Sequence, residues 1–342
     1  MKTRIAALCA LVALGICNAT AETYPSRPVT MVVPYPAGGP TDTIARILIE
    51  RTRVSLGQPI IIENVSGAGG TIGVGKVARA TPDGYTLSIG HWETHVVNGA
   101  TYALQYDVVR DFEPVGLIAS TPMWIVARNN FPAKNLGELI AWLKDNPDKL
   151  SVATIGTGGS GHIAGIHFQQ MTGTRFQFVP YRGGGPAVQD LLAGQIDLLF
   201  GQGATSLAQV RGGKLKVYAV MAKTRWWAAP EIPTIDEAGV PGLHMSWWHG
   251  LWVPKGTPHS IIVKLNIAIA DALADPAVRR RLTDFGQDIP SGEQQTPEAL
   301  GTLQRFEICN SLRSPIQVLA RSASALRAAE PSPRDLCSSA SP

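Results

Sequence analysis

One local pattern occurs twice in this chain and limits the folds it can adopt. A β-branched run leads into a glycine-rich loop and then into the start of an amphipathic helix. Residues 32–42 read VVPYPAGGPTD, and residues 153–162, about 120 residues later, read ATIGTGGSGH. A strand followed by a tight loop and a helix is typical of parallel sheets covered by helices. Two distant copies predict two α/β lobes, each with one such loop at a cleft between them.

The rest of the chain follows the same alternation. Strands are predicted at residues 29–33, 60–63, 86–90, 152–155, 176–179, 196–200 and 216–221. Helices are predicted at residues 41–56, 72–80, 161–172, 187–193, 207–211, 258–273 and 276–285. With 342 residues, of which 45% are hydrophobic, the chain is long enough for two domains with a sizeable core.

The N-terminus is typical of an export signal. Lys2 and Arg4 precede an apolar run from Ile5 to Ile16, and Ala19-Thr20-Ala21 matches a cleavage site. The run is shorter than the ~20 residues of a membrane helix. We therefore expect residues 1–21 to be a signal peptide cleaved after Ala21, and a periplasmic mature protein.

Charge and cysteine content narrow the class of function. Of the net charge of +4, half lies in the first residues and half in residues 308–342, so the segment between is neutral overall. No basic face for nucleic acid is expected. Cys309 and Cys337, the two cysteines beyond the signal, lie near the C-terminus, and the histidines match no metal motif. No metal and no cofactor are predicted.

Three segments of the sequence resemble enzyme motifs, and each also has a purely structural interpretation. Residues 156–161 match G-x-G-x-x-G, but no acidic residue follows at the distance needed to hold a ribose. Residues 70–76 resemble a phosphate loop, yet Val77 replaces the required Ser or Thr, and Lys76 is expected inside a helix. Ser160 and His162 lie close together, so a periplasmic hydrolase stays open as an alternative function. No acidic residue lies in sequence register to orient the histidine, as such a hydrolase requires. The favoured prediction is that the protein is not an enzyme.

The two glycine-rich loops predict how a ligand would be held. Helix N-termini expose unpaired N–H groups and carry partial positive charge, and glycines let several amides converge on one anion. Two such loops across a cleft would bind a carboxylate without lysine or arginine. The hypothesis assigns positive φ to Gly39 and Gly159, and it places Asp42 in the first helical turn, pointing away from the cleft.

At these residues the chain resembles the Bug family, the periplasmic solute-binding receptors of tripartite tricarboxylate transporters. The matching segments read YPxRP at 24–28, VVPYPAGGxxDxxAR at 32–46, LGQ at 56–58, ENxxGAGGxxG at 63–73, PDGYTL at 82–87, VPYxG at 179–183, GQxD at 194–197 and PTxxEAG at 233–239. The resemblance covers about residues 24–307.

The resemblance implies a two-lobed α/β periplasmic binding protein of the Venus-flytrap, type II-like kind. Lobe 1 would comprise residues 22–125 and 250–307, and lobe 2 residues 126–249. The family's carboxylate pincer would fall on the Gly38–Asp42 loop and on the loop at residues 157–162. Residues 308–342 depart from the family pattern, so they are expected to form a poorly ordered tail, and the final helix of lobe 1 is left in doubt.

The ligand is expected to be a small organic carboxylate. His91-Trp92 follows a lobe 1 strand, and Phe178, Tyr181 and Arg182 lie in lobe 2, which favours an aromatic mono- or dicarboxylate as one option. The candidate ligand-binding residues are Tyr35, Ala37, Gly38, Gly39, Thr41, Trp92, Thr94, Thr157, Gly158, Gly159, Ser160, His162, Phe178, Arg182 and Gly183. Expected partners are the membrane subunits of a transporter, or in an alternative a sensor kinase, and the protein is expected to be a monomer.

Overall fold

The computed structural model describes residues 23–155 and 158–313, with side chains described to Cys309. Its strands are β1 (Val29–Val33), β2 (Ile60–Asn64), β3 (Thr86–His91), β4 (Phe112–Arg128), β5 (Ser151–Ile155), β6 (Gln177–Tyr181), β7 (Leu198–Gln202), β8 (Leu215–Val220) and β9 (Ser246–Pro254). Its longer helices are α2 (Pro40–Leu56), α3 (Thr71–Ala78), α5 (Leu136–Asp145), α6 (Ser160–Thr172), α7 (Gly184–Ala193), α8 (Gly203–Arg211), α9 (His259–Ala274), α10 (Pro276–Asp284) and α11 (Pro297–Arg313). A π-helical turn (Glu93–Val97) and the short α4 (Asn98–Thr101) follow β3.

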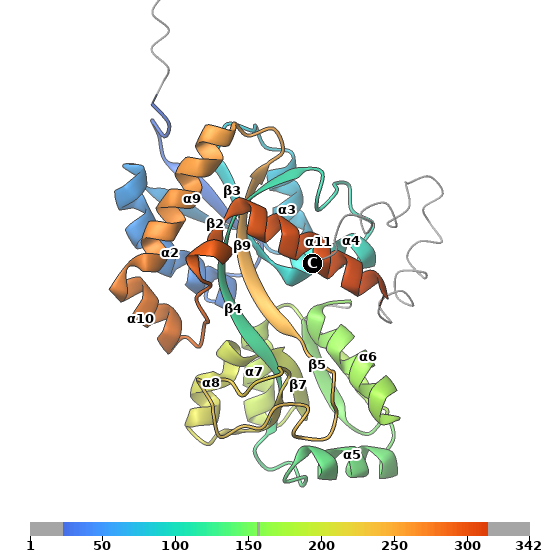
Figure 1. Ribbon diagram of the computed structural model, residues 1–342. Coiled ribbons are helices and arrows are strands. Elements are labelled where there is room, and N and C mark those ends of the chain that lie inside the picture. The colour runs from blue at the N-terminus through green and yellow to red at the C-terminus, as the bar shows by residue number, and fades with distance from the viewer. Residues whose placement is uncertain (1–22, 156–157, 314–342) are drawn as a thin grey trace, which may run out of the picture.

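The strands form two α/β lobes that share one long strand (Figure 1). In the first lobe β1 pairs in parallel with β2 and β3, and β9 pairs antiparallel with β3 and with the first part of β4. In the second lobe β5 pairs in parallel with β6 and β7, and the last part of β4 pairs antiparallel with β7 and β8. The division proposed from the sequence, after residue 125 and before residue 250, falls within β4 and β9 and stays a prediction.

Each lobe buries both faces of its sheet under helices. In the first lobe Met31 and Val33 pack beneath α2 and α9, whereas Val32 faces the opposite side with Trp252 and α11. This inside–outside alternation follows from the two-residue period of a strand. In the second lobe α5 and α6 cover one face of the sheet, and α7 and α8 cover the other.

The C-terminal boundary expected after Glu307 is wrong. Helix α11 continues to Arg313, Ile308 packs against the first-lobe core, and Cys309 is buried and disulfide-bonded. The final helix of the first lobe is therefore present, since these apolar residues continue its buried face. The expected signal peptide and the rest of the tail, from residue 314 on, lie outside the described residues.

Three further observations concern expectations from the sequence. Lys76 lies inside α3, as expected, and pairs with Glu63. Among the described residues no helix is long and apolar enough to cross a membrane. The same residues contain no group of three or more His, Cys, Asp or Glu that could hold a metal.

Candidate ligand-binding site

A cavity of about 290 Å³ lies between the two lobes. The first lobe contributes the loop between β1 and α2 together with His91, and the second lobe contributes the loop before α7 and the ends of β5 and β7. Trp247, near the start of β9, completes the lining. The described lining residues are Tyr35, Pro36, Ala37, Gly38, Gly39, Pro40, Thr41, His91, Ile155, Arg182, Gly183, Gly184, Gly185, Pro186, Gln202 and Trp247.

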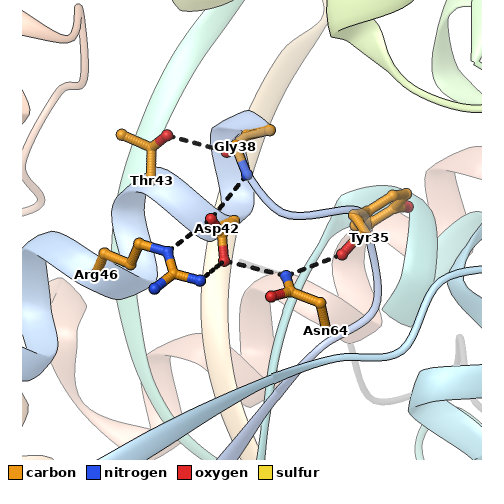
Figure 2. A network of polar contacts seen from close by, with 7 residues as sticks. Tyr35, Gly38, Asp42, Thr43, Arg46 and Asn64 are labelled. Carbon is orange, nitrogen blue, oxygen red and sulfur yellow. Dashed lines mark hydrogen bonds and ion pairs between the residues drawn. The ribbon is translucent and has the colours of Figure 1, made fainter.

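A carboxylate network holds the β1–α2 loop in place (Figure 2). Asp42 Oδ2 accepts from the Gly38 N–H at 2.8 Å and from Arg46 Nε at 2.8 Å. Asn64 Nδ2 donates at 3.0 Å both to Asp42 Oδ1 and to the carbonyl of Tyr35. Burial opposes ionisation of Asp42, but the hydrogen bonds from Arg46, Gly38 and Asn64 outweigh it and lower the pKa of the carboxyl. Asp42 is thus in the first turn of α2, as expected, and it does not line the cavity.

This network corrects the role expected for the glycines of the loop. The residue with positive φ is Gly38, at +80°, whereas Gly39 has an ordinary φ of −76°. The Gly38 amide already donates to Asp42, so it does not serve as a free anion donor in this conformation. Because Pro40 begins α2, the first amides of the helix without an intrahelical acceptor belong to Thr41 and Asp42.

The second-lobe wall of the cavity is built on the N-terminus of α7. Gly183 precedes the helix, and Gly184 and Gly185 form its start, so their amides also lack intrahelical acceptors. A Cβ on Gly183 or Gly185 would meet no atom within 4 Å, which leaves the backbone accessible. Arg182 is exposed and forms no ion pair within the described part of the chain.

The electrostatic character of the cavity follows from these groups. The N-termini of α2 and α7 border it from opposite lobes, and Arg182 adds a full positive charge. No Asp or Glu occurs among the described lining residues. Such a lining stabilises an anion.

Three aromatic rings form one wall. Tyr35 stacks on His91 at 4.9 Å between ring centres, and His91 lies 4.5 Å from Trp247. Burial, with neighbouring His249 and His95, lowers the pKa of His91 far below its ordinary value, so the ring is neutral. Its Nδ1 accepts from the Glu93 N–H at 3.2 Å, which places the ring proton on Nε2. The wall is therefore aromatic and uncharged.

The described residues of the second glycine-rich loop do not line this cavity. None of Gly158, Gly159, Ser160 and His162 lines the cavity, and Thr157 lies outside the described residues. The Ser160 N–H and Oγ instead donate to Glu93 Oε2 of the first lobe, at 3.3 and 3.4 Å. Positive φ belongs to Gly158, at +82°, and not to Gly159.

Three further candidates are also placed away from the cavity lining. Trp92 is buried in the first-lobe core and donates from Nε1 to Glu307 at 3.2 Å. The Thr94 hydroxyl bonds the backbone of His91, donating to its carbonyl and accepting from its N–H. Phe178 packs edge-on against His162 at 4.4 Å. All three have structural partners that a sequence pattern does not reveal.

Several lining residues were missed by sequence reasoning. His91, Ile155 and Gln202 each end a strand, at β3, β5 and β7, where α/β sheets place ligands. Their position at the end of a strand is the sequence signal that could have identified them. Trp247 is the second residue of β9, a strand that was not predicted. Its Nε1 and Gln202 Oε1 are buried without a hydrogen-bond partner among the described residues, so the lining offers one unsatisfied donor and one unsatisfied acceptor.

The contacts of Ser160 and His162 bear on the alternative that the protein is a hydrolase. The Ser160 hydroxyl donates to Glu93, and His162 Nδ1 accepts from the Gly158 N–H at 2.9 Å. The described contacts of the two side chains therefore do not join a nucleophile to a base.

Comparison with known proteins identifies the family. Residues 44–304 match the tripartite tricarboxylate transporter family receptor, TctC. The chain belongs to this family. Its members are periplasmic solute-binding receptors, and among them are Bug proteins.

Solved structures of related receptors share the two-lobed fold. MatC from Rhodopseudomonas palustris, with bound malate, is 40% identical with a TM-score of 0.81, covering 87% of this chain and 100% of that one. The periplasmic binding protein BugD is 38% identical with a TM-score of 0.80, covering 88% and 99%. Rpa4515 from R. palustris, with adipate, is 32% identical with a TM-score of 0.81, covering 87% and 98%.

The φ angles of the β1–α2 loop predict different costs for two adjacent substitutions. Gly38→Ala should lower the free energy of unfolding by about 1–2 kcal/mol, because a side chain disfavours positive φ while the space itself is open. Gly39→Ala should change it by less than about 0.5 kcal/mol. Urea unfolding followed by tryptophan fluorescence measures both, and equal costs would contradict the loop conformation.

The environment of Glu93 predicts a pH dependence of stability. Burial raises the pKa of Glu93 to about 8, although hydrogen bonds from Ser160 and Tyr35 act in the opposite direction. Between the ordinary glutamate value of about 4.5 in the unfolded chain and about 8 in the folded protein, the folded state binds more protons. The free energy of unfolding should therefore fall as the pH rises through this window, relative to Glu93→Gln, and the difference should level off above it.

Urea unfolding from about pH 5 to about pH 9 tests this dependence. The variant Glu231→Gln, at an exposed position, is the matched control and should keep the wild-type slope. Parallel profiles for wild type and Glu93→Gln would show that Glu93 is not held in this environment.

Proposed function

We propose that this receptor binds a small organic carboxylate in the cavity between α2 and α7 and delivers it to the membrane subunits of a tripartite tricarboxylate-type transporter. The observation that carries the proposal is the convergence of two helix N-termini and Arg182 on a cavity without a described acidic lining residue. The carboxylates named for the related structures, malate and adipate, support the same ligand class.

The revised clamp differs from the one expected from the sequence. The first lobe contributes the amides at the start of α2, and the second lobe contributes the amides of Gly184 and Gly185 in place of the residues 157–162 loop. Amides of this kind bind an oxyanion through hydrogen bonds and through the helix dipole. Arg182 is positioned to pair with a second acidic group at the other end of the ligand.

Location and partners complete the proposal. We also propose export with cleavage after Ala21, action as a monomer, and delivery to a transporter. The N-terminal sequence supports the export, and the family supports the delivery. A sensor adaptor that presents its bound ligand to a histidine kinase is the alternative. It has the same site and differs in its partner, so recovery of membrane proteins from an extract with and without ligand separates the two.

Calorimetric titration with succinate, malate and adipate tests the ligand class and the role of Arg182. Arg182→Gln should weaken binding of a dicarboxylate about tenfold or more, since a charge-assisted hydrogen bond contributes about 1.5–3 kcal/mol. Lys144→Gln, on the exposed side of α5, should leave the affinity unchanged. Equal affinities for wild type and Arg182→Gln would remove Arg182 from the site, and no binding of any organic acid would refute the proposed function.

An aromatic acid is a second candidate ligand, because Tyr35, His91 and Trp247 offer a wall against which a ring can pack. Terephthalate or benzoate should then quench the fluorescence of the wild type and of Trp92→Phe in a saturable way. The quenching should be lost in Trp247→Phe. Quenching that disappears in Trp92→Phe and persists in Trp247→Phe would return the aromatic contact to the position expected from the sequence.

A further inference from the structure

Glu93 forms a carboxyl contact between the lobes. It begins the π-helical turn after β3 and is 1% exposed. Its Oε2 accepts from the backbone N–H of Ser160 at 3.3 Å and from Ser160 Oγ at 3.4 Å. Ser160 is the first residue of α6, so an acid of the first lobe occupies the amide end of a second-lobe helix.

The surrounding backbone is fitted closely to this contact. A Cβ on Gly159 would lie 3.1 Å from Glu93 Oε2 and 2.3 Å from the carbonyl oxygen of Ile155. A Cβ on Gly158 would lie 3.0 Å from Thr101 Cβ of the first lobe. These glycines therefore permit the α6 N-terminus to approach the first lobe, and the carboxyl of Glu93 fills the position where its amide donates.

Among the described residues, Glu93 forms no ion pair that would account for its burial. Within the described part of the chain no Lys or Arg forms a salt bridge with it, and its other side-chain partner is Tyr35, which lines the cavity. Its neighbours His91 and His95 are both kept neutral by burial, which lowers the pKa of each. A buried acid bonded to the start of a helix and to the cavity wall reproduces the contacts that a ligand carboxylate would make.

We propose that Glu93 is a specificity-determining residue whose carboxyl group occupies the N-terminus of α6 and excludes a ligand carboxylate from it. The inference rests on the proposed function and deepens it. A carboxylate in the cavity is left with the α2 and α7 ends and Arg182. The site therefore binds less tightly any diacid whose two carboxylates would have to contact the N-termini of α2 and α6 at the same time.

Calorimetric titration tests whether Glu93 excludes a ligand carboxylate from α6. The ligands are diacids of four to eight carbons, each compared with the monoacid of the same length. The readout is the ratio of diacid affinity to monoacid affinity. Glu93→Ser should raise this ratio at least tenfold for one or more lengths, or about 1.4 kcal/mol, because it exposes the Ser160 donors. Glu93→Gln keeps the shape and an acceptor oxygen, so its ratio should stay within about twofold of wild type.

Ser160→Ala, alone and combined with Glu93→Ser, completes a double-mutant cycle. In the wild-type background it should leave the affinity ratio unchanged, because Glu93 and not the ligand uses the hydroxyl. In the Glu93→Ser background it should reverse part of the gain, since Oγ is lost and the backbone amide remains.

Two outcomes overturn the proposal. One is an unchanged ratio in a Glu93→Ser protein that melts cooperatively. The other is a loss of diacid affinity of fivefold or more for Ser160→Ala alone, which would mean that a ligand carboxylate reaches α6 despite Glu93. The second readout needs no substitution of Glu93, so it applies even where Glu93→Ser fails to fold. A wild type that binds no acid of either series up to about 10 mM would instead refute the proposed function.

Discussion

The pairing of β4 with β9 is the constraint on which the cavity depends. The two strands lie side by side from Phe112 and Pro254 to Pro122 and Ser246, and beyond that point β4 joins β7 and β8 of the second lobe. The lobes therefore meet along a fixed line, with Trp247 and His91 next to it. Backbone hydrogen bonds across this ladder, rather than any side chain of the site, decide which loops of the two lobes come together (Figure 1).

Three helix N-termini lie at the junction of the lobes, and each has a different partner. The end of α2 is ordered by Asp42, which takes the Gly38 amide and is itself held by Arg46 and Asn64. The end of α6 donates to Glu93. The amide end of α7 follows Arg182 and borders the cavity. Unpaired amides at a buried helix end are costly, so under our proposal the carboxyl groups of Asp42 and Glu93 affect which helix ends remain for a ligand.

Sequence reasoning succeeded where the information is local. The β1–α2 loop could be predicted because proline and glycine mark the end of a strand and the start of a helix within ten residues. The long β4 and β9 could not, since a strand buried on both faces is a continuous apolar run without alternation. The contact between Glu93 and Ser160 joins residues 67 positions apart in different lobes, and it depends on the register of strands that were themselves not predicted. For the same reason Trp92 was expected at the ligand, whereas its indole packs in the core.

The Glu93–Ser160 contact also joins the two lobes. Separation of the lobes would break both hydrogen bonds from Ser160 and return the carboxyl to water. Burial is what raises the pKa of Glu93 to about 8, so near neutral pH the closed arrangement favours the protonated acid and a hydrated one favours the carboxylate. The side chain that we propose excludes a ligand carboxylate from α6 is therefore also part of the contact that joins the two lobes.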